Sequence, residues 1–436
     1  MFNRPRAFDA RIAAYCVFAT LVHVAPSMAG DWPHWRGPFR NGVVDESLGD
    51  VAATWADAAS AWRANVGEGA TSPIVVAGRV YVMGWRDGRD TVVCLEASTG
   101  RELWNQSYAC PKYGRRAVGD EGLYSGPTSS PEFDPTREKL FTLSADGGLN
   151  CWDPAREGAQ VWSRNLYDDY DVPQRPRHGR SGRRDYGYTT APLAWGDWVI
   201  VEVGAGEGTL MAFDQTSGRR VWTSECRDPA GHSGGLVPLT VEGVPCVAVM
   251  TYRGLLVARL DAGHEGRTVA EHEWTTDFAN NIATPAVHEN SVLITSAYNH
   301  QAICRLDVDL QGARKVWEQP FASKVCSPIV HDGRITWAWQ TMHCLDFASG
   351  AERWSGGTFG DAGSCVLTKD RKLIVWGGHG KLALVDAAKG ATRYREISVR
   401  DRLARSDVWP HVVLADGRLL CKDREGGIAC FPLKSE

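Results

Sequence analysis

The sequence predicts an all-β fold, an eight-bladed β-propeller of four-stranded blades whose ring is closed by an N-terminal outer strand. Two observations support this prediction. A strand–turn–strand unit recurs along the chain, and AFDQTSGRRVW from Ala212 to Trp222 is its clearest copy. Eight short strand starts, each with a small residue and often a proline, accompany these units, but only seven units are complete.

The repeated unit has an acidic residue, a glycine four residues later and an aromatic residue four residues after that. Strict copies span residues 94–104, 212–222, 344–354 and 384–394, and looser copies lie around Trp162, Trp274 and Trp317. The acid accepts backbone N–H bonds and the glycine tolerates a positive φ, so the unit closes a hairpin. The aromatics are 37 to 60 residues apart, which is the length of a four-stranded blade.

The two ends of the chain supply the missing outer strand. Residues 411–431 show three strand patterns and then stop, while Trp62 has the aromatic of an outer strand with no blade before it. Joining Trp62 to the last segment completes an eighth blade and leaves no open sheet edge. We therefore assign residues 61–436 to the propeller.

The N-terminal residues 1–29 are predicted to be a signal peptide. Three arginines precede an apolar run from Ile12 to Ala25, and Ser27-Met28-Ala29 has small residues where a signal peptidase needs them. The run is too short and too interrupted to cross a membrane, so we expect no transmembrane segment. The chain is expected to be periplasmic or secreted after cleavage near Ala29. Residues 30–60 are then expected to form an ordered strap that packs on the ring.

Composition and short motifs narrow the function. A formal charge of −4 without a long basic tract gives no reason to expect nucleic acid as a partner, and we expect a monomer. The sequence contains no HExxH or CxxC motif, which predicts no local metal site. The run His232-Ser233-Gly234-Gly235 lies in a loop between blades, where backbone accommodation is more common than chemistry, so no catalytic group is assigned. Most cysteines are expected to be small buried residues. A disulfide between Cys421 and Cys430 stays open, because the two face each other if the last hairpin turns at Glu425-Gly426.

Two long loops between blades are the candidate binding region. They span residues 106–126 and 167–189, and loops of this length in compact domains are usually functional or mobile. Their basic side chains suit an anionic ligand or an acidic partner surface. The alternative is a solvated loop that its own aspartates neutralise. The basic residues are Arg115, Arg116, Arg175, Arg177, His178, Arg180, Arg183 and Arg184.

Turns between the two middle strands of each blade are expected on the same face of the ring. They contribute Arg253, His300 and His379 as further candidates for binding. Histidine titrates near neutral pH and so suits acid–base chemistry. A solvated turn histidine is the more common occurrence, however, and no catalytic residue is assigned.

The repeat resembles the pyrroloquinoline-quinone-type (PQQ-like) propeller repeat, small-x-Asp-x-x-Thr-Gly-x-x-x-Trp, which Ala212, Asp214, Ser217, Gly218 and Trp222 match. The resemblance runs from about Trp62 to the end of the chain. It implies that an aromatic residue docks each blade on its neighbour, with Tyr394 as a departure. The implied docking residues are Trp62, Trp104, Trp162, Trp222, Trp274, Trp317 and Trp354. The segment WPHWRGPFRNG also resembles the start of secreted propellers of planctomycete-like bacteria.

Two functional classes share this resemblance. Quinoprotein alcohol dehydrogenases hold the quinone with calcium above the channel, and BamB-like propellers are periplasmic scaffolds without chemistry. The sequence has neither the adjacent cysteine pair nor the CxxCH haem site of the dehydrogenases. The first hypothesis is therefore an exported non-enzymatic scaffold that binds a protein or polyanionic ligand on the long-loop face, with no cofactor. The alternative is an oxidoreductase similar to PQQ-dependent alcohol dehydrogenases, with PQQ and calcium.

Overall fold

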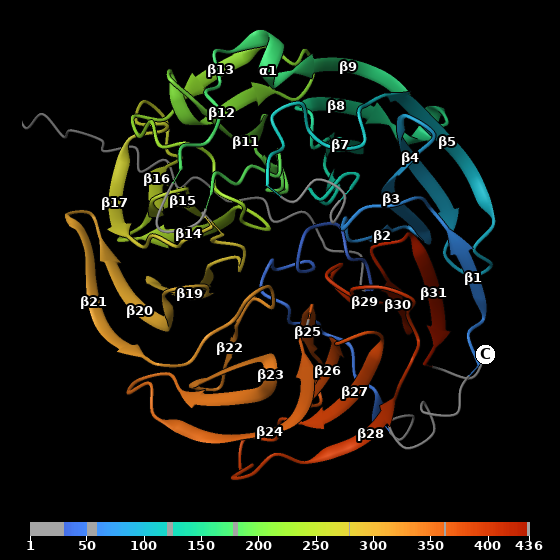
Figure 1. Cartoon of the computed structure of the whole chain (residues 1–436), viewed down its shortest axis with the longest axis vertical. Helices are drawn as coiled ribbons and strands as arrows, with labels where there is room; N and C mark the ends of the chain where they lie inside the picture. Colours follow the sequence, from blue (N-terminus) through green and yellow to red (C-terminus); the bar gives the residue numbers. More distant parts are fainter. Residues whose placement is uncertain are drawn as a thin grey trace, which may run out of the picture.

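The computed structural model describes residues 30–49, 59–119, 125–177, 182–278, 280–361 and 363–433. These residues form eight antiparallel sheets arranged in a ring around a central axis (Figure 1). The predicted all-β, eight-bladed propeller is confirmed. Helical structure is limited to short turns such as η3 (Pro154–Arg156) and α1 (Leu166–Asp169). The predicted signal peptide and its cleavage site lie outside the described residues.

The first four blades each have four strands in simple meander order. Blade 1 consists of β2 (Ile74–Val76), β3 (Arg79–Arg86), β4 (Arg89–Glu96) and β5 (Glu102–Ala109), and blade 2 of β6 (Glu132–Asp134), β7 (Lys139–Leu143), β8 (Gly148–Asp153) and β9 (Ala159–Asn165). Blade 3 consists of β10 (Leu193–Trp195), β11 (Trp198–Ala205), β12 (Gly208–Asp214) and β13 (Arg220–Thr223), and blade 4 of β14 (Val237–Val241), β15 (Val244–Met250), β16 (Gly254–Arg259) and β17 (Thr268–Glu273).

The other four blades include one exception and the closing blade. Blade 5 consists of β18 (Ala286–His288), β19 (Ser291–Ala297), β20 (Gln301–Asp309) and β21 (Gly312–Gln319), and blade 6 of β22 (Ile329–His331), β23 (Arg334–Asp346) and β24 (Glu352–Gly360). Blade 7 consists of β25 (Ser364–Leu367), β26 (Lys372–Gly377), β27 (Lys381–Asp386) and β28 (Glu396–Arg400), and blade 8 of β29 (Val413–Ala415), β30 (Arg418–Lys422), β31 (Gly427–Pro432) and β1 (Trp62–Asn65).

Blade 6 differs from the four-stranded expectation because its two middle strands merge. The first part of β23 pairs with β22, and the part from Gln340 onward pairs with β24. Gln340 has a φ of +59°, and the register with β24 shifts between Gln340 and Met342. The other blades have a separate hairpin where blade 6 has this local irregularity.

The ring closes through β1, as predicted. β1 is antiparallel to β31, with Trp62 opposite Cys430 and Asn65 opposite Gly427. The sheet order β1-β31-β30-β29 joins the two ends of the described chain in one blade. In Figure 1 the blue strand β1 lies outside the red strands of blade 8.

Docking between blades follows the repeated unit. In four places the tryptophan ring of one blade lies over a turn glycine of the next: Trp62 on Gly100, Trp104 on Gly158, Trp162 on Gly218 and Trp317 on Gly350. Each of these glycines has a φ near +70°, and a Cβ would lie within 2.9 Å of the ring. Glycine is thus required twice, for its backbone conformation and for the close ring. Trp222 packs with Trp198 against a cluster that includes blade 4, and the Trp354 ring lies 6.2 Å from that of Tyr394 in blade 7.

Trp274 occupies a different position from the other tryptophans. In blade 4 the residue four positions after Gly266 is Ala270, which lies opposite Val257 in β16. Trp274 lies beyond the end of β17, where its Nε1 donates to Ser296 Oγ of blade 5 (3.0 Å) and its ring stacks on His300. It therefore contacts the next blade from the loop end rather than from the outer strand.

The N-terminal segment 30–49, here called the strap, crosses the centre of the ring (Figure 1). Its Trp32 makes two backbone hydrogen bonds with Val75 of blade 1, and the Trp35 indole donates to Thr284 Oγ1 before blade 5 (2.9 Å). Arg40 pairs with Glu132 of blade 2, and the Val44 N–H donates to Leu367 of blade 7 (2.9 Å). The strap thus ties opposite sides of the ring together across the channel.

The hydrogen-bond register of the last hairpin does not favour a disulfide between Cys421 and Cys430. Cys421 pairs with Ala429, and Cys430 pairs with Leu420. Because side chains alternate across a strand, the two cysteines project to opposite faces of the sheet. Both are buried free thiols, as are the other cysteines of the described residues. The expectation that most cysteines act as small buried residues is in line with this arrangement.

Candidate functional site

The two long loops meet at a funnel over the central channel. The funnel has a volume of about 250 Å³, below the roughly 300–1,000 Å³ of pockets that hold drug-sized ligands. The segments between blades form most of its wall, and Trp35 of the N-terminal strap also lines it. The lining residues that the argument uses are Trp35, Arg184, Tyr186, His232, Ser233, Phe278, Asn280, Tyr298, Lys324, Trp409 and Arg424.

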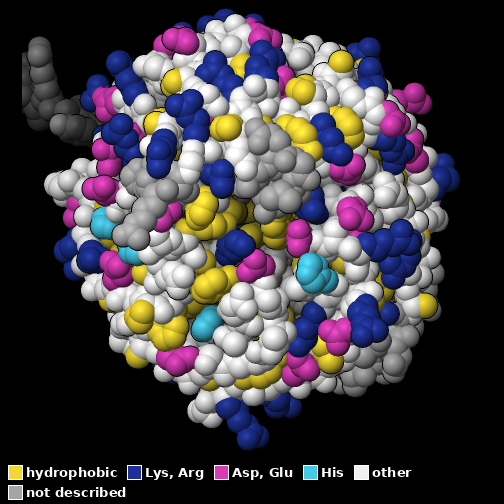
Figure 2. All heavy atoms as spheres, viewed as in Figure 1, with side chains coloured by type: hydrophobic (Ala, Val, Ile, Leu, Met, Phe, Trp, Pro, Cys, Tyr) yellow, Lys and Arg dark blue, Asp and Glu magenta, His cyan; other side chains and the backbone are white. Residues whose placement is uncertain are grey.

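Aromatic side chains form part of the wall of the funnel, and two of its three cations lie over aromatic rings. The Arg184 guanidinium lies 5.5 Å from the centre of the Phe278 ring, and that of Arg424 lies 5.9 Å from the Trp409 ring. The ring of Phe278 in turn meets that of Tyr298 edge to face. Figure 2 shows hydrophobic side chains around the central hollow with Lys and Arg side chains among them. Such a surface suits a ligand that has both an apolar part and a negative charge.

Two polar side chains of the funnel each have a buried oxygen atom without a hydrogen-bond partner among the described residues. Ser233 Oγ and Asn280 Oδ1 have no hydrogen-bond partner among the described residues, although both side chains are at least nine-tenths buried. Buried polar groups are normally paired, so these atoms point to a ligand or water. Among the residues that the structure describes, no Asp or Glu lines the funnel. Lys324 and Arg424 are balanced by Asp361 and Asp407, which lie outside the lining.

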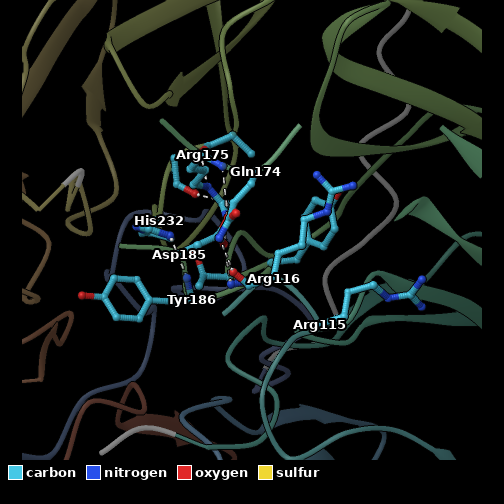
Figure 3. A network of polar contacts seen from close by, with 12 residues as sticks. Arg115, Arg116, Gln174, Arg175, Asp185, Tyr186 and His232 are labelled. Atoms are coloured by element: carbon cyan, nitrogen blue, oxygen red, sulfur yellow. Dashed lines mark hydrogen bonds and ion pairs between the residues drawn. The ribbon is translucent and has the colours of Figure 1, made fainter. Parts of the chain in front are cut away.

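The two long loops are held against each other below the funnel. Val118 and Asp185 exchange backbone hydrogen bonds of 3.0 and 3.1 Å, and the Gln174 side chain donates to the Arg116 carbonyl. Asp185 accepts from the Arg175 guanidinium at 2.5 Å, and both side chains are at least 95% buried. Arg175 also donates to Ala230 and Gly231, as in Figure 3. Arg175 therefore anchors its loop inside the protein and does not face a partner.

The remaining predicted site residues are distributed over several places. Arg115 pairs with Asp146 and Asp168, and Arg116 lies over the Tyr167 ring, so both belong to the outer part of the loops (Figure 3). Arg183 donates to the Gln174 side chain. Arg177 and Arg253 line a separate hollow that also contains Asp228 and Glu271. His178 and Arg180 lie outside the described residues.

The two turn histidines lie apart from the funnel lining. His300 stacks on Trp274 and its Nε2 lies 3.1 Å from Glu318, while His379 is exposed with Asp407 4.0 Å away. Of the predicted basic residues that the structure describes, only Arg184 lines the funnel. Lys324, Phe278, Ser233, Asn280 and Trp409 were not predicted, because each lies in an ordinary-looking segment between blades. Their common signal is their place just before a strand start.

Burial of Glu202 makes the folding stability of the protein depend on pH. Glu202 lies on β11, accepts from Thr190 Oγ1 at 2.5 Å and from the Gly231 N–H at 2.8 Å, and is almost fully buried. Burial outweighs these hydrogen bonds and raises the pKa of Glu202 to about 6. The folded state therefore binds the Glu202 proton more tightly than the unfolded chain does.

Replacing Glu202 with glutamine should remove this pH dependence. In the wild type, ionisation of Glu202 should lower the free energy of unfolding by about 2 kcal/mol as the pH rises from about 4.5 to above 6. At higher pH, Glu202 should cause no further loss. Denaturant unfolding of wild type and Glu202→Gln at pH 4 and 7.5 measures the difference. Glu207→Gln, at an exposed carboxylate on the next turn, is the control and should match the wild type. Parallel curves for wild type and Glu202→Gln would contradict the assignment.

The funnel does not provide the ligands of the quinone–calcium centre implied by the alternative hypothesis. Calcium in proteins is bound by carboxylate and carbonyl oxygens, whereas no carboxylate is among the described residues that line the funnel. No cluster of three or more His, Cys, Asp or Glu side chains suited to a metal occurs in the described ranges. The chain also has no adjacent cysteine pair to cover a quinone ring.

Fold and site together define a β-propeller with a strapped channel and an aromatic, basic funnel on its long-loop face. Residues 47–120 and 125–356 match the family model described as outer membrane protein assembly factor BamB. The chain belongs to this BamB family. No curated protein sequence matches it. In the part of the chain that the structure describes, no helix is long and apolar enough to cross a membrane.

Solved structures of both functional classes share the fold. A europium-containing methanol dehydrogenase has a TM-score of 0.64 and 12% identity over 91% of this chain and 90% of its own. BamB from Moraxella catarrhalis has a TM-score of 0.56 and 14% identity over 87% of this chain and 98% of its own. A quinohemoprotein alcohol dehydrogenase from Comamonas testosteroni has a TM-score of 0.63 and 14% identity over 93% and 81%. At these identities the likeness extends to the fold alone.

Proposed function

We propose that the chain is an exported, non-enzymatic binding protein whose funnel and surrounding long loops hold an acidic segment of a partner protein. The single observation that carries the proposal is the lining of the funnel. Its described residues combine Arg184, Lys324 and Arg424 with aromatic rings, and no carboxylate is among them. A carboxylate next to an aromatic or aliphatic side chain satisfies both features of this wall.

Membership in the BamB family and the partly unpaired polar atoms support the same proposal. The family model is named for a factor in outer membrane protein assembly. Ser233 Oγ and Asn280 Oδ1 are available to hydrogen-bond the backbone or side chain of an inserted segment. The size of the funnel suits a few side chains rather than a folded element. We propose a monomer in the periplasm or outside the cell, which binds its partner without a cofactor.

Three labelled peptides of equal length test this function. One alternates glutamate with tyrosine, the second replaces each glutamate with glutamine, and the third replaces each with lysine. The wild type should bind the acidic peptide at least about tenfold more tightly than the amide peptide, with an affinity that falls as salt rises. Fluorescence anisotropy measures the dissociation constants. Equal affinity for all three peptides would overturn the proposal.

Matched variants locate the binding surface. Arg184→Gln and Lys324→Gln should each weaken acidic-peptide binding about fivefold to tenfold by removing one cation from the funnel. Arg219→Gln, at an exposed position on the outer turn of blade 3, should leave it unchanged. The same assay tests the quinoprotein alternative. Saturable binding of PQQ that requires calcium and displaces the peptide would favour an oxidoreductase similar to the alcohol dehydrogenases.

A further inference from the structure

Two buried cysteines from neighbouring blades have their sulfur atoms in contact. Cys326 lies in the segment before β22 of blade 6, and Cys365 is in β25 of blade 7. Their Sγ atoms are 3.6 Å apart, and both residues are at most 1% exposed. The pair is far apart in sequence, and neither residue belongs to the repeated turn unit. Packing within one blade does not explain why these two cysteines are in contact.

A buried arginine of the strap lies within electrostatic range of the same pair. Arg36 is 1% exposed, and its Nη2 donates to the carbonyls of Pro328 (2.5 Å) and Asn41 (3.1 Å). Its Nε and Nη1 have no hydrogen-bond partner among the described residues. A buried guanidinium is strongly disfavoured without an anion. Burial lowers the pKa of Arg36 to about 10, and the nearby Cys326 and Cys365 act against that shift.

The pair is therefore asymmetric. The hydrogen bond between the two thiols, the backbone hydrogen bond of Ala338 and the charge of Arg36 together lower the pKa of Cys326 despite burial. The hydrogen bond to Cys326 and burial raise the pKa of Cys365. Isolated buried cysteines behave differently, since burial raises the pKa of Cys344 to about 11. The thiolate is the nucleophile in disulfide exchange, so Cys326 is the attacking sulfur.

We propose that Cys326 and Cys365 are a redox pair that closes a disulfide between blades 6 and 7, with Arg36 as the positioning residue that keeps Cys326 reactive. The Cys326 thiolate attacks one sulfur of an oxidant disulfide and displaces the other as a thiolate. Cys365 then gives its proton to that thiolate and attacks Cys326 Sγ, which releases the second half of the oxidant. The oxidant takes up two electrons and leaves as one thiol and one thiolate, which takes its proton from water, while the two cysteines lose two electrons.

Redox titration of the full chain tests the pair. The protein is brought to equilibrium in glutathione buffers from fully reduced to fully oxidised, then trapped with an alkylating agent in denaturant and mapped by mass spectrometry. We expect a Cys326–Cys365 linked peptide to replace the two alkylated peptides as the buffer becomes oxidising. The variant Cys344→Ser, which removes an isolated buried thiol, should give the same linked peptide. Alkylation of both Cys326 and Cys365 in the most oxidising buffer would overturn the proposal.

A pH profile tests the function of Arg36 separately from the fold. The charged and titratable groups that face Cys326 are Arg36 from the strap and Cys365 from β25. His411, which interacts electrostatically with Arg36, is neutral at working pH because burial lowers its pKa to about 3. Disulfide formation at pH 7 should be about tenfold slower in Arg36→Met, with its rate rising at higher pH, and Arg36→Lys should restore much of the rate. If both variants fold and form the disulfide with the same dependence on pH as the wild type, Arg36 does not control the reactivity of Cys326.

Discussion

Replacing Arg40 with alanine should destabilise the protein by about 3–5 kcal/mol, because it leaves a buried carboxylate without its counter-charge. Arg40 holds Glu132 through both of its terminal nitrogens, and Glu132 is fully buried. Glu132 also accepts from the Ala194 N–H of blade 3 and lies 3.2 Å from His34 of the strap. One substitution thus disturbs contacts among the strap, blade 2 and blade 3. Chemical denaturation at pH 7 measures the loss.

The sign of the pH dependence checks the cause. Burial opposes ionisation of Glu132, but Arg40 and His34 outweigh it and lower the pKa of Glu132. A lowered pKa contributes stability above the unfolded value of about 4.5, which is lost as the pH falls below it. The difference between wild type and Arg40→Ala should therefore be larger at pH 7 than at pH 3. Arg101→Ala removes an exposed arginine beside Glu96 and should cost less than about 1 kcal/mol. Equal losses for Arg40→Ala and Arg101→Ala would contradict the assignment.

Replacing Gly218 with alanine should cost about 3 kcal/mol. Gly218 has a φ of +68°, which costs an alanine about 1–2 kcal/mol. The new Cβ would also lie 2.7 Å from Cδ2 of Trp162, and overpacking of this kind costs about 1–3 kcal/mol. Trp162 has little room to move, because its Nε1 donates to the Gln215 carbonyl at 2.9 Å.

A second turn glycine separates the two contributions. Gly196 has a φ of +56°, but no atom lies within 4 Å of its added Cβ. Gly196→Ala should therefore cost only about 1 kcal/mol, from the backbone alone. Thermal and denaturant unfolding of both variants measures the difference. If Gly218→Ala is no less stable than Gly196→Ala, the contact with the Trp162 ring does not contribute to docking between blades.

The ring could be predicted from the sequence because its information is local and repeated. The turn around Asp214 and Gly218 carries its own backbone chemistry, and counting such turns leaves one outer strand for Trp62. The merged strand β23 could not be predicted, since Gln340 gives no turn signal such as glycine or asparagine. The position of Trp274 was also missed, because an insertion moved the tryptophan but left Gly266 and Ala270 in the regular register.

The candidate site was only partly predictable, because it is made of segments that meet only after the ring closes. Loop length and charge indicated the part of the ring where the funnel lies, and Arg184 lines the funnel. The same criteria included Arg175, whose charge is neutralised by a buried ion pair with Asp185. Charge in a sequence does not distinguish an anchor from a ligand contact. Lys324 and Asn280 carry no signal until distant blades bring them together.

The pairing of Trp62 with Cys430 has a consequence for how the molecule is made. The first strand of the ring finds its sheet only when the last hairpin has been synthesised, so the closing contact has nearly the longest sequence separation that the chain allows. Contacts of this kind form slowly because a large loop entropy must be overcome first. Until then blade 8 lacks its outer strand and blade 1 lacks a neighbour. The nascent chain therefore has two exposed sheet edges, which are sites for aggregation until the ring closes.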